Sequence, residues 1–245
     1  MRISIRSFLK SLLSFLLPKS LYNALRDFKN LYITRFATKS YSQEGEDLLL
    51  RRIFEHQKNG FYVDVGAHHP FRFSNTYLLY KRGWRGINVD AMPGSMRLFR
   101  KFRPRDINIE CGVGLGGGAL MYYMFNEPAL NGFSPELSTS YANHPRYHLK
   151  AQVPVRVRKL SEILDSHLPL QTHIDVLSVD CEGLDLEVLQ SNDWSKYKPG
   201  VILVESFGSD LAQIMDNSIY ALLDSHQYRL HAKLHNTLIF QRNDV

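Results

Sequence analysis

Five short apolar stretches of this sequence end in acidic residues or in glycine. These ends are Asp64 with Gly66, Asp90, residues 110 to 112, Asp180 with Glu182, and Glu205. In an open α/β sheet the carboxyl ends of parallel strands lie along one edge, where ligands bind. Acidic side chains gathered at such an edge lose hydration and repel one another, which folding alone does not explain. The pattern therefore predicts a site for a cation or a polyhydroxylated ligand.

The loop at residues 66 to 70 follows the first stretch and restricts the chemistry of the ligand. Gly66 lets the backbone approach a ligand closely, and Asp90, somewhat more than about 20 residues further along, can accept both hydroxyls of a ribose. The two later glycines of a dinucleotide fingerprint are absent, so a pyrophosphate has no close seat on the next helix. The loop favours a ligand without phosphates and disfavours a nicotinamide-dependent oxidoreductase.

His68 and His69 lie in the same loop and have three uses to weigh. Adjacent histidines in an extended loop point in different directions, so chelation of one metal ion by both is disfavoured. A single general base or a donor that orients the ligand is the better functional use. The alternative, that both only satisfy the backbone of the loop, stays open.

The second chemical cluster is Asp180-Cys181-Glu182-Gly183. Two acids at positions i and i+2 of a strand end can both face a pocket where the strand gives way to a turn at Gly183. One can face a positively charged cofactor while the other takes a proton from a substrate hydroxyl. No histidine is placed near Cys181 by sequence, so we interpret it as a packed thiol.

Alternating strands and helices must position these residues. The sequence predicts strands that begin at residue 61 and cover 86–90, 107–111, 174–180 and 201–205, and helices that begin at Ser42 and cover 74–80, 96–102, 160–167, 184–190 and 211–226. Residues 228–234 and 237–241 predict a closing antiparallel hairpin. This order is typical of a doubly wound, mostly parallel, Rossmann-like α/β sheet, in a domain that covers residues 41–245.

Residues 122–151 break this alternation. The segment mixes aromatic residues with Asn, Pro and His and predicts a long irregular insertion. Such insertions in α/β domains more often form a lid or a substrate surface than packing.

The first 40 residues form a basic extension. They carry eight Lys and Arg against Asp27, or +7, so the total of +6 leaves −1 for the rest of the chain. A nearly neutral body argues against nucleic acid as a partner, and the arm predicts contact with an anionic surface.

The apolar run 8–17 is too short to span a bilayer, which takes about 20 residues. It fits an in-plane membrane helix, so residues 1–30 could meet a membrane surface. A helix docked on the body or on a second subunit of a homo-oligomer is the alternative.

The bulk composition adds two limits. A chain of 245 residues with 44% hydrophobic residues can bury a full core. Two cysteines are too few for a disulfide framework, so a reduced, cytoplasmic setting, peripheral to the inner face of a membrane, is the expectation.

Taken together, several motifs resemble the FkbM family of S-adenosylmethionine-dependent methyltransferases. The matching stretches are YSQEGED (41–47), FYVDVGAHHP (61–70), SNT (74–76), GWRGINVDA (83–91), RPRD (103–106), LSVDCEGLDLEVL (177–189) and NTL (236–238). Ser178 stands where many members have a lysine, which weakens any mechanism that relies on that lysine.

The resemblance implies S-adenosylmethionine as the cofactor and transfer of its methyl group to a hydroxyl of a sugar, glycolipid or polysaccharide. It implies a cofactor site made by Gln43, Asp64, Gly66, Ala67, His68, Asn75, Asp90, Ala91, Gly112, Val113 and Asp180. We expect Asp180 or Glu182 to act as the base, with His68 as the competing choice. No resident metal is predicted, although a divalent ion would suit the acids. The alternative function is a non-catalytic cofactor-binding or scaffold subunit of a membrane-associated glycan assembly complex.

Overall fold

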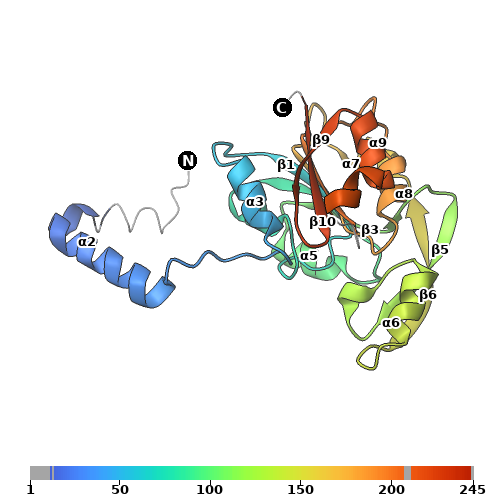
Figure 1. Cartoon of the computed structure of the whole chain (residues 1–245), viewed down its shortest axis with the longest axis horizontal. Helices are drawn as coiled ribbons and strands as arrows, with labels where there is room; N and C mark the ends of the chain where they lie inside the picture. The colour runs from blue at the N-terminus through green and yellow to red at the C-terminus, as the bar shows by residue number, and fades with distance from the viewer. Residues whose placement is uncertain (1–11, 13, 207–210, 244–245) are drawn as a thin grey trace. The chain divides into compact units, whose positions relative to one another are not determined.

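The computed structural model describes residues 12, 14–206 and 211–243 of the chain. Contacts between residues divide it into two compact units, Met1–Lys39 and Ser40–Val245. In its described part the first unit has helical residues at 12 and 14–16, helix α2 (Lys19–Phe28), which Figure 1 labels, and the π-helical segment η1 (Lys29–Thr34). Half of the predicted helix at residues 8–17 lies within the described residues, of which 12 and 14–16 are helical.

The second unit is built on a sheet that has seven strands within the described residues, in the order β3-β2-β1-β7-β8-β10-β9. The parallel strands are β1 (Phe61–Val65), β2 (Arg85–Asp90), β3 (Ile107–Glu110), β7 (Val176–Val179) and β8 (Val201–Glu205), and the antiparallel hairpin is β9 (Tyr228–Lys233) and β10 (Thr237–Arg242). The predicted mostly parallel sheet and its terminal hairpin are confirmed.

Helices cover both faces of this sheet because the side chains of its strands alternate. On β1, Val63 and Val65 pack in one apolar cluster with residues of α7 (Leu160–His167), α8 (Asp185–Gln190) and α9 (Ser218–Ser225). Tyr62 points to the opposite face and packs in a second cluster with residues of α3 (Glu46–Ile53) and α4 (Tyr77–Lys81). Helix α5 (Met96–Phe102) forms a third cluster. Val63 and Tyr62 are both fully buried, so β1 is the centre of a doubly wound fold.

The segment expected to be an irregular insertion contains regular structure. Strands β4 (Gly112–Val113), β5 (Gly118–Phe125) and β6 (Leu149–Arg158) form a second sheet in the order β4-β6-β5, and β5 and β6 pair over most of their length. The 3-10 turn η2 (Pro128–Leu130) and helix α6 (Pro135–Ala142) connect them. Periodicity did not reveal β5 and β6 because half of the residues in each strand are exposed, so neither strand is a buried apolar run.

Two helix boundaries differ from the predictions for local reasons. The helix predicted at 211–226 is interrupted: η3 (Leu211–Asp216) ends before Asn217, whose side chain accepts a hydrogen bond from the Ile219 N–H and caps α9. Helix α3 begins at Glu46 rather than at Ser42, because Gly45 has a φ of 95°. Gln43 therefore lies in the turn before α3 and not in the helix.

Among the described residues, no helix is long and apolar enough to cross a membrane.

Candidate functional site

The chain reverses its direction of winding between β1 and β7, and the residues after these two strands lie next to each other. Gly66 follows β1 with a φ of 78°, and a Cβ on it would lie 1.7 Å from the carbonyl oxygen of Asp180, which follows β7. The Asp180 N–H also donates to the Val65 carbonyl. Only glycine fits this contact, so the two predicted site residues are brought together by backbone packing.

A cavity opens at this switch point. Eight of the residues predicted from sequence line it: Gln43, Gly66, His68, Asp90, Ala91, Val113, Asp180 and Glu182. The second sheet and its connection add a wall that sequence reasoning did not assign, made of Tyr122, Pro128, Ala129, Asn131 and Phe133. The aromatic content of residues 122–151 was the only signal for this wall, and it did not say which residues would face the cavity.

Asp64, predicted to bind the cofactor, lies behind the cavity wall in a buried polar network. Its carboxylate accepts a hydrogen bond from the Thr76 hydroxyl at 2.6 Å. Fully buried Arg103 donates to Thr76 and Tyr62 and pairs with Asp106 at 2.8 Å. Burial raises the pKa of Asp64, while the Arg103 charge lowers it. In this conformation Asp64 ties β1 to the start of α4 through Thr76, and its contact with a cofactor stays a prediction.

Three other predicted residues support the cavity without lining it. Ala67 is buried in the apolar cluster that it forms with side chains of α5. Asn75 donates to the Ser178 hydroxyl at 3.1 Å. A Cβ on Gly112 would lie 2.7 Å from the Phe133 ring, so glycine there lets this ring close the wall. Their direct roles in binding also stay predictions.

Asp90 presents a carboxylate at the end of β2. It accepts the N–H of His68 at 2.8 Å and the N–H of Met92 at 2.9 Å, one on each oxygen. Burial raises the pKa of Asp90, and the two backbone hydrogen bonds oppose that shift. The carboxylate is therefore fixed in orientation and keeps lone pairs that can accept hydroxyl donors.

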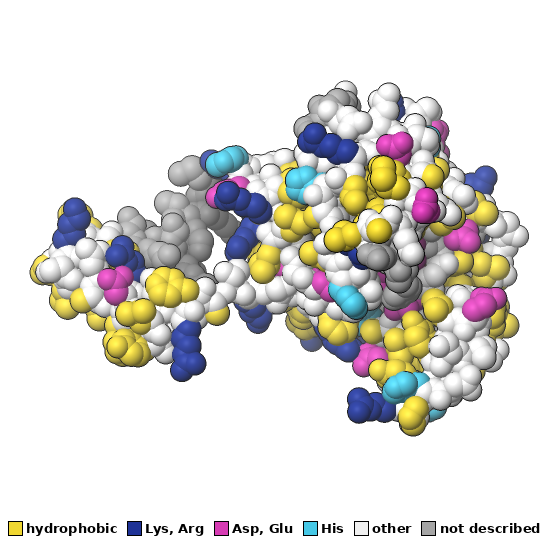
Figure 2. Space-filling model, viewed as in Figure 1, with side chains coloured by type: hydrophobic (Ala, Val, Ile, Leu, Met, Phe, Trp, Pro, Cys, Tyr) yellow, Lys and Arg dark blue, Asp and Glu magenta, His cyan; other side chains and the backbone are white. Residues whose placement is uncertain are grey.

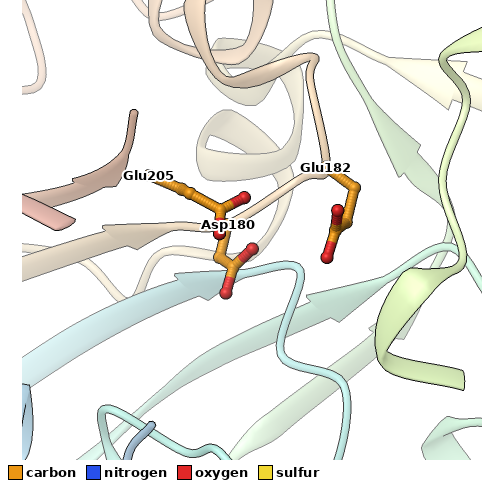
Figure 3. Close-up of side chains that lie close together, drawn as sticks. All are labelled: Asp180, Glu182 and Glu205. Atoms are coloured by element: carbon orange, nitrogen blue, oxygen red, sulfur yellow. The ribbon is translucent and has the colours of Figure 1, made fainter. Parts of the chain in front are cut away.

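Three acids meet at the carboxyl ends of β7 and β8. One carboxyl oxygen from each of Asp180, Glu182 and Glu205 lies within 4.8 Å of the other two, and Figure 3 shows the Asp180 and Glu205 groups side by side. Burial raises the pKa of Asp180 strongly, and the charges of Asp185 and Glu182 raise it further. Burial and the Asp180 charge raise the pKa of Glu205 to about 11. Two buried carboxyl groups this close cannot both ionise cheaply, so the charge of one raises the pKa of the other.

The same oxygens are of the type that Mg²⁺ or Mn²⁺ prefers. Three carboxylates would supply about half of the six positions that Mg²⁺ fills. The expectation of no resident metal stays a prediction.

Glu182 is held by the segment that closes the cavity. Its backbone has a φ of 48°, and its carboxylate accepts the Tyr141 hydroxyl of α6 at 3.0 Å. Gly132 packs so closely that a Cβ on it would lie 2.9 Å from the Glu182 Cβ. Burial raises the pKa of Glu182 to about 7, and the Tyr141 hydrogen bond opposes this shift. A group that titrates near neutral pH is suited to accept a proton.

Two other candidates for chemistry are less well suited. Burial and the charge of Arg72 lower the pKa of His68 to about 4, so its imidazole is neutral at pH 7 but a weak proton acceptor. Burial raises the pKa of Cys181 well above its usual range, which leaves a thiol rather than a nucleophilic thiolate. Asp185 orders this loop by accepting the N–H groups of Cys181 and Gly183.

The cavity therefore combines features that suit a cofactor with a nucleoside and a cationic end. Val89 and Val113 offer apolar contact, Asp90 offers acceptors for ribose hydroxyls, and Asp180 and Glu182 offer negative charge. Such acids attract a cation or a hydroxyl and repel phosphate, in keeping with a ligand that lacks phosphates.

The sequence profile of the methyltransferase FkbM domain family matches residues 64–230. No curated protein matches the sequence.

Solved structures similar to this chain include two methyltransferases. Precorrin-6y C5,15-methyltransferase from Geobacter metallireducens GS-15 is 13% identical over 84% of this chain and 93% of its own, with a TM-score of 0.43. A TehB-like SAM-dependent methyltransferase from Corynebacterium glutamicum ATCC 13032 Kitasato is 12% identical over 93% of this chain and 100% of its own, with a TM-score of 0.41. With scores this low, neither likeness says anything about the residues of the cavity.

Proposed function

Because this chain belongs to the FkbM methyltransferase family, with S-adenosylmethionine as its cofactor, we propose that it is an O-methyltransferase that acts on a hydroxyl of a sugar, glycolipid or polysaccharide. The observation that carries the proposal is Glu182, a carboxylate with a pKa of about 7 in the same cavity as Gly66 and Asp90. A hydroxyl must lose its proton as it accepts a methyl group, and a base with a pKa near the working pH removes it best.

The residues of the cavity fit the cofactor. When bound, S-adenosylmethionine supplies a methyl group on a positively charged sulfur. Asp90 would accept the ribose hydroxyls, and Val113, Val89 and Cys111 would contact the adenine. Gly66 and Gln43 would enclose the amino-acid end. The acids Asp180 and Glu182 oppose the positive charge, which lowers the cost of keeping them ionised in a buried place.

Glu182 is the stronger candidate for the base. The pKa of Asp180 is raised by burial and by its acidic neighbours, so this carboxyl is less available as a proton acceptor. His68, with its pKa near 4, would release a proton too readily to hold it at neutral pH. We assign Asp180 to orienting the acceptor hydroxyl and to balancing the positive charge, because alignment of the reacting groups supplies much of the rate in a displacement of this kind.

The charge of the cavity favours a neutral, hydroxyl-rich acceptor. Asp180, Glu182 and the amide of Asn131 line one cavity, and each can bind a hydroxyl group. An acceptor with a phosphate or carboxylate at the reacting end would be repelled by the two acids. A neutral sugar ring matches this set, with any anionic carrier kept outside the cavity.

The test is transfer of tritium from S-[methyl-³H]adenosylmethionine to a panel of nucleotide sugars and lipid-linked glycans. We expect a labelled product from a glycan in the panel. Glu182→Gln should reduce kcat by about 10²- to 10⁴-fold. Glu187→Gln, the same change on α8 outside the cavity lining, should keep normal turnover.

Calorimetry separates the alternatives. Asp180→Asn should abolish transfer while leaving much of the affinity for S-adenosylmethionine, and normal turnover in this variant would remove Asp180 from the mechanism. Cofactor binding without transfer to any hydroxyl would favour the non-catalytic scaffold. If neither S-adenosylmethionine nor S-adenosylhomocysteine binds, the proposed enzyme is wrong.

A further inference from the structure

Helix α2 of the N-terminal unit presents an uncovered apolar face. Leu21, Leu25 and Phe28 are 47%, 52% and 56% exposed, and their spacing of four and three residues places them on one side of the helix. Tyr32 of η1 continues this side, with its ring centroid 5.1 Å from that of Phe28. None of the α2 residues is buried. A helix that packs on protein buries such a stripe, and within the described residues of its own unit nothing covers this one.

Basic side chains accompany the apolar face. Between residues 14 and 39 the chain has five Lys and Arg and a single acid, Asp27, which gives a net charge of +4. On a helical wheel Lys19 and Arg26 lie opposite the apolar side, and Lys29 lies at its border. Figure 2 shows hydrophobic and basic side chains exposed together on the visible face of this unit.

The helix continues into a wider exposed region and then ends. In η1 and just after it, Leu31, Ile33 and Phe36 are 55%, 69% and 70% exposed. Arg35 and Phe36 have φ values of 48° and 57°, and the Phe36 N–H bonds back to the Asn30 carbonyl, which closes the helix. The amphipathic segment is thus a defined unit of 16 residues, Lys19–Thr34, with an apolar side and a cationic side.

The geometry points to an anionic lipid surface as the partner, and we propose that Lys19–Thr34 lies in the plane of such a membrane with Leu21, Leu25 and Phe28 buried in it. A segment of 16 residues rises at most about 24 Å, less than the ~30 Å of a hydrocarbon core, so it cannot cross. Leucine and phenylalanine on one face with cations around them are the composition of in-plane helices. Pairing with a second copy of the chain would bring two clusters of like charge together, which disfavours that occupant.

This inference does not depend on methyl transfer. If the proposed function also holds, the same contact places the enzyme beside acceptors that are anchored in lipid, and it raises their concentration near the cavity.

The test is co-flotation of the full-length protein with vesicles. Vesicles of phosphatidylcholine with phosphatidylglycerol should carry the protein at least tenfold better than vesicles of phosphatidylcholine alone, because each cation near an anionic surface adds about fivefold to binding. High salt should weaken this binding. Arg26→Glu changes the charge by two and should reduce it by roughly 25-fold.

A matched pair of variants isolates the apolar face. Leu25→Asp adds one negative charge on the apolar side and should abolish flotation, whereas Asn23→Asp adds the same charge on the polar side and should reduce binding by only about fivefold. Thermal unfolding of both variants should match the parent, since α2 has no buried residue. Equal flotation of Leu25→Asp and the parent would overturn the proposal. Absence of lipid binding would also overturn the proposal. This includes the outcome in which sedimentation shows that Leu25 mediates self-association.

Discussion

The hydrogen bond from Tyr141 to Glu182 makes a quantitative prediction about the pH dependence of catalysis. Tyr141→Phe removes the hydroxyl that donates to the Glu182 carboxylate at 3.0 Å and leaves the ring in place. This hydrogen bond stabilises the ionised form, so its loss must raise the pKa of Glu182 further above its present value of about 7.

The size of the shift follows from the strength of such a bond. A hydrogen bond to a charged group contributes about 1.5 kcal/mol at the lower end of its range, and 1.36 kcal/mol corresponds to one pKa unit. We therefore expect the acidic limb of the kcat/KM profile to move from near pH 7 to near pH 8. At pH 7 the ionised fraction falls from about one half to about one tenth, a loss of roughly fivefold, and above about pH 9 the variant regains the parent rate.

The assay is kcat/KM for methyl transfer across this pH range, with Tyr147→Phe as control. Tyr147 is in the same insertion, stacks on His144 and does not line the cavity, so its profile should match the parent. An acidic limb that stays near pH 7 in Tyr141→Phe would refute the role of Glu182 as the base. A loss that is equal at all pH values would show that Tyr141 only supports the fold.

Two further substitutions test the packing around the site, and removal of metal tests the acidic cluster. Gly66→Ala places a methyl group 1.7 Å from the Asp180 carbonyl at a φ of 78°, so we expect about 3 kcal/mol lower stability in urea unfolding and weaker cofactor binding, and an unchanged midpoint would contradict the close contact. Arg103→Met leaves Asp106 buried without its ion-pair partner and should cost about 3 to 5 kcal/mol, whereas exposed Arg100→Met should cost under about 0.5 kcal/mol in the same urea titration. Dialysis against EDTA should leave methyl transfer unchanged, and loss of activity that Mg²⁺ restores would show that the acidic cluster holds a cation.

The acidic cluster also affects stability through pH. The folded pKa of Glu182 is above its ordinary value, so the native state binds more protons than the unfolded state between about pH 4.5 and 7. Stability of the cofactor-free protein therefore falls as pH rises through this window. A bound cationic cofactor opposes this loss, because it favours the ionised acids.

The sequence by itself determined the central sheet and the ends of its strands. The runs at residues 61–65, 86–90 and 201–205 are rich in apolar and β-branched residues and are followed by or end in acids or glycine. These signals lie within each segment, and the structure has strands at all three places. The role of Gly66 could also be predicted from the sequence, because a positive φ and a close backbone contact both require glycine. These signals were enough to predict the doubly wound sheet and most of one cavity wall.

Only the tertiary structure decided which acid has which environment. Asp64 is the last residue but one of β1 and Asp90 is the last of β2, but Asp64 faces the buried Arg103 network and Asp90 faces the cavity. The hydrogen bond between Tyr141 and Glu182 joins residues 41 positions apart in the sequence. It depends on the second sheet, which the hydrophobic periodicity of the sequence did not predict. Burial and charge neighbours, which set the pKa of each acid, are properties of packing across the chain, so the choice of Glu182 as the base required the fold.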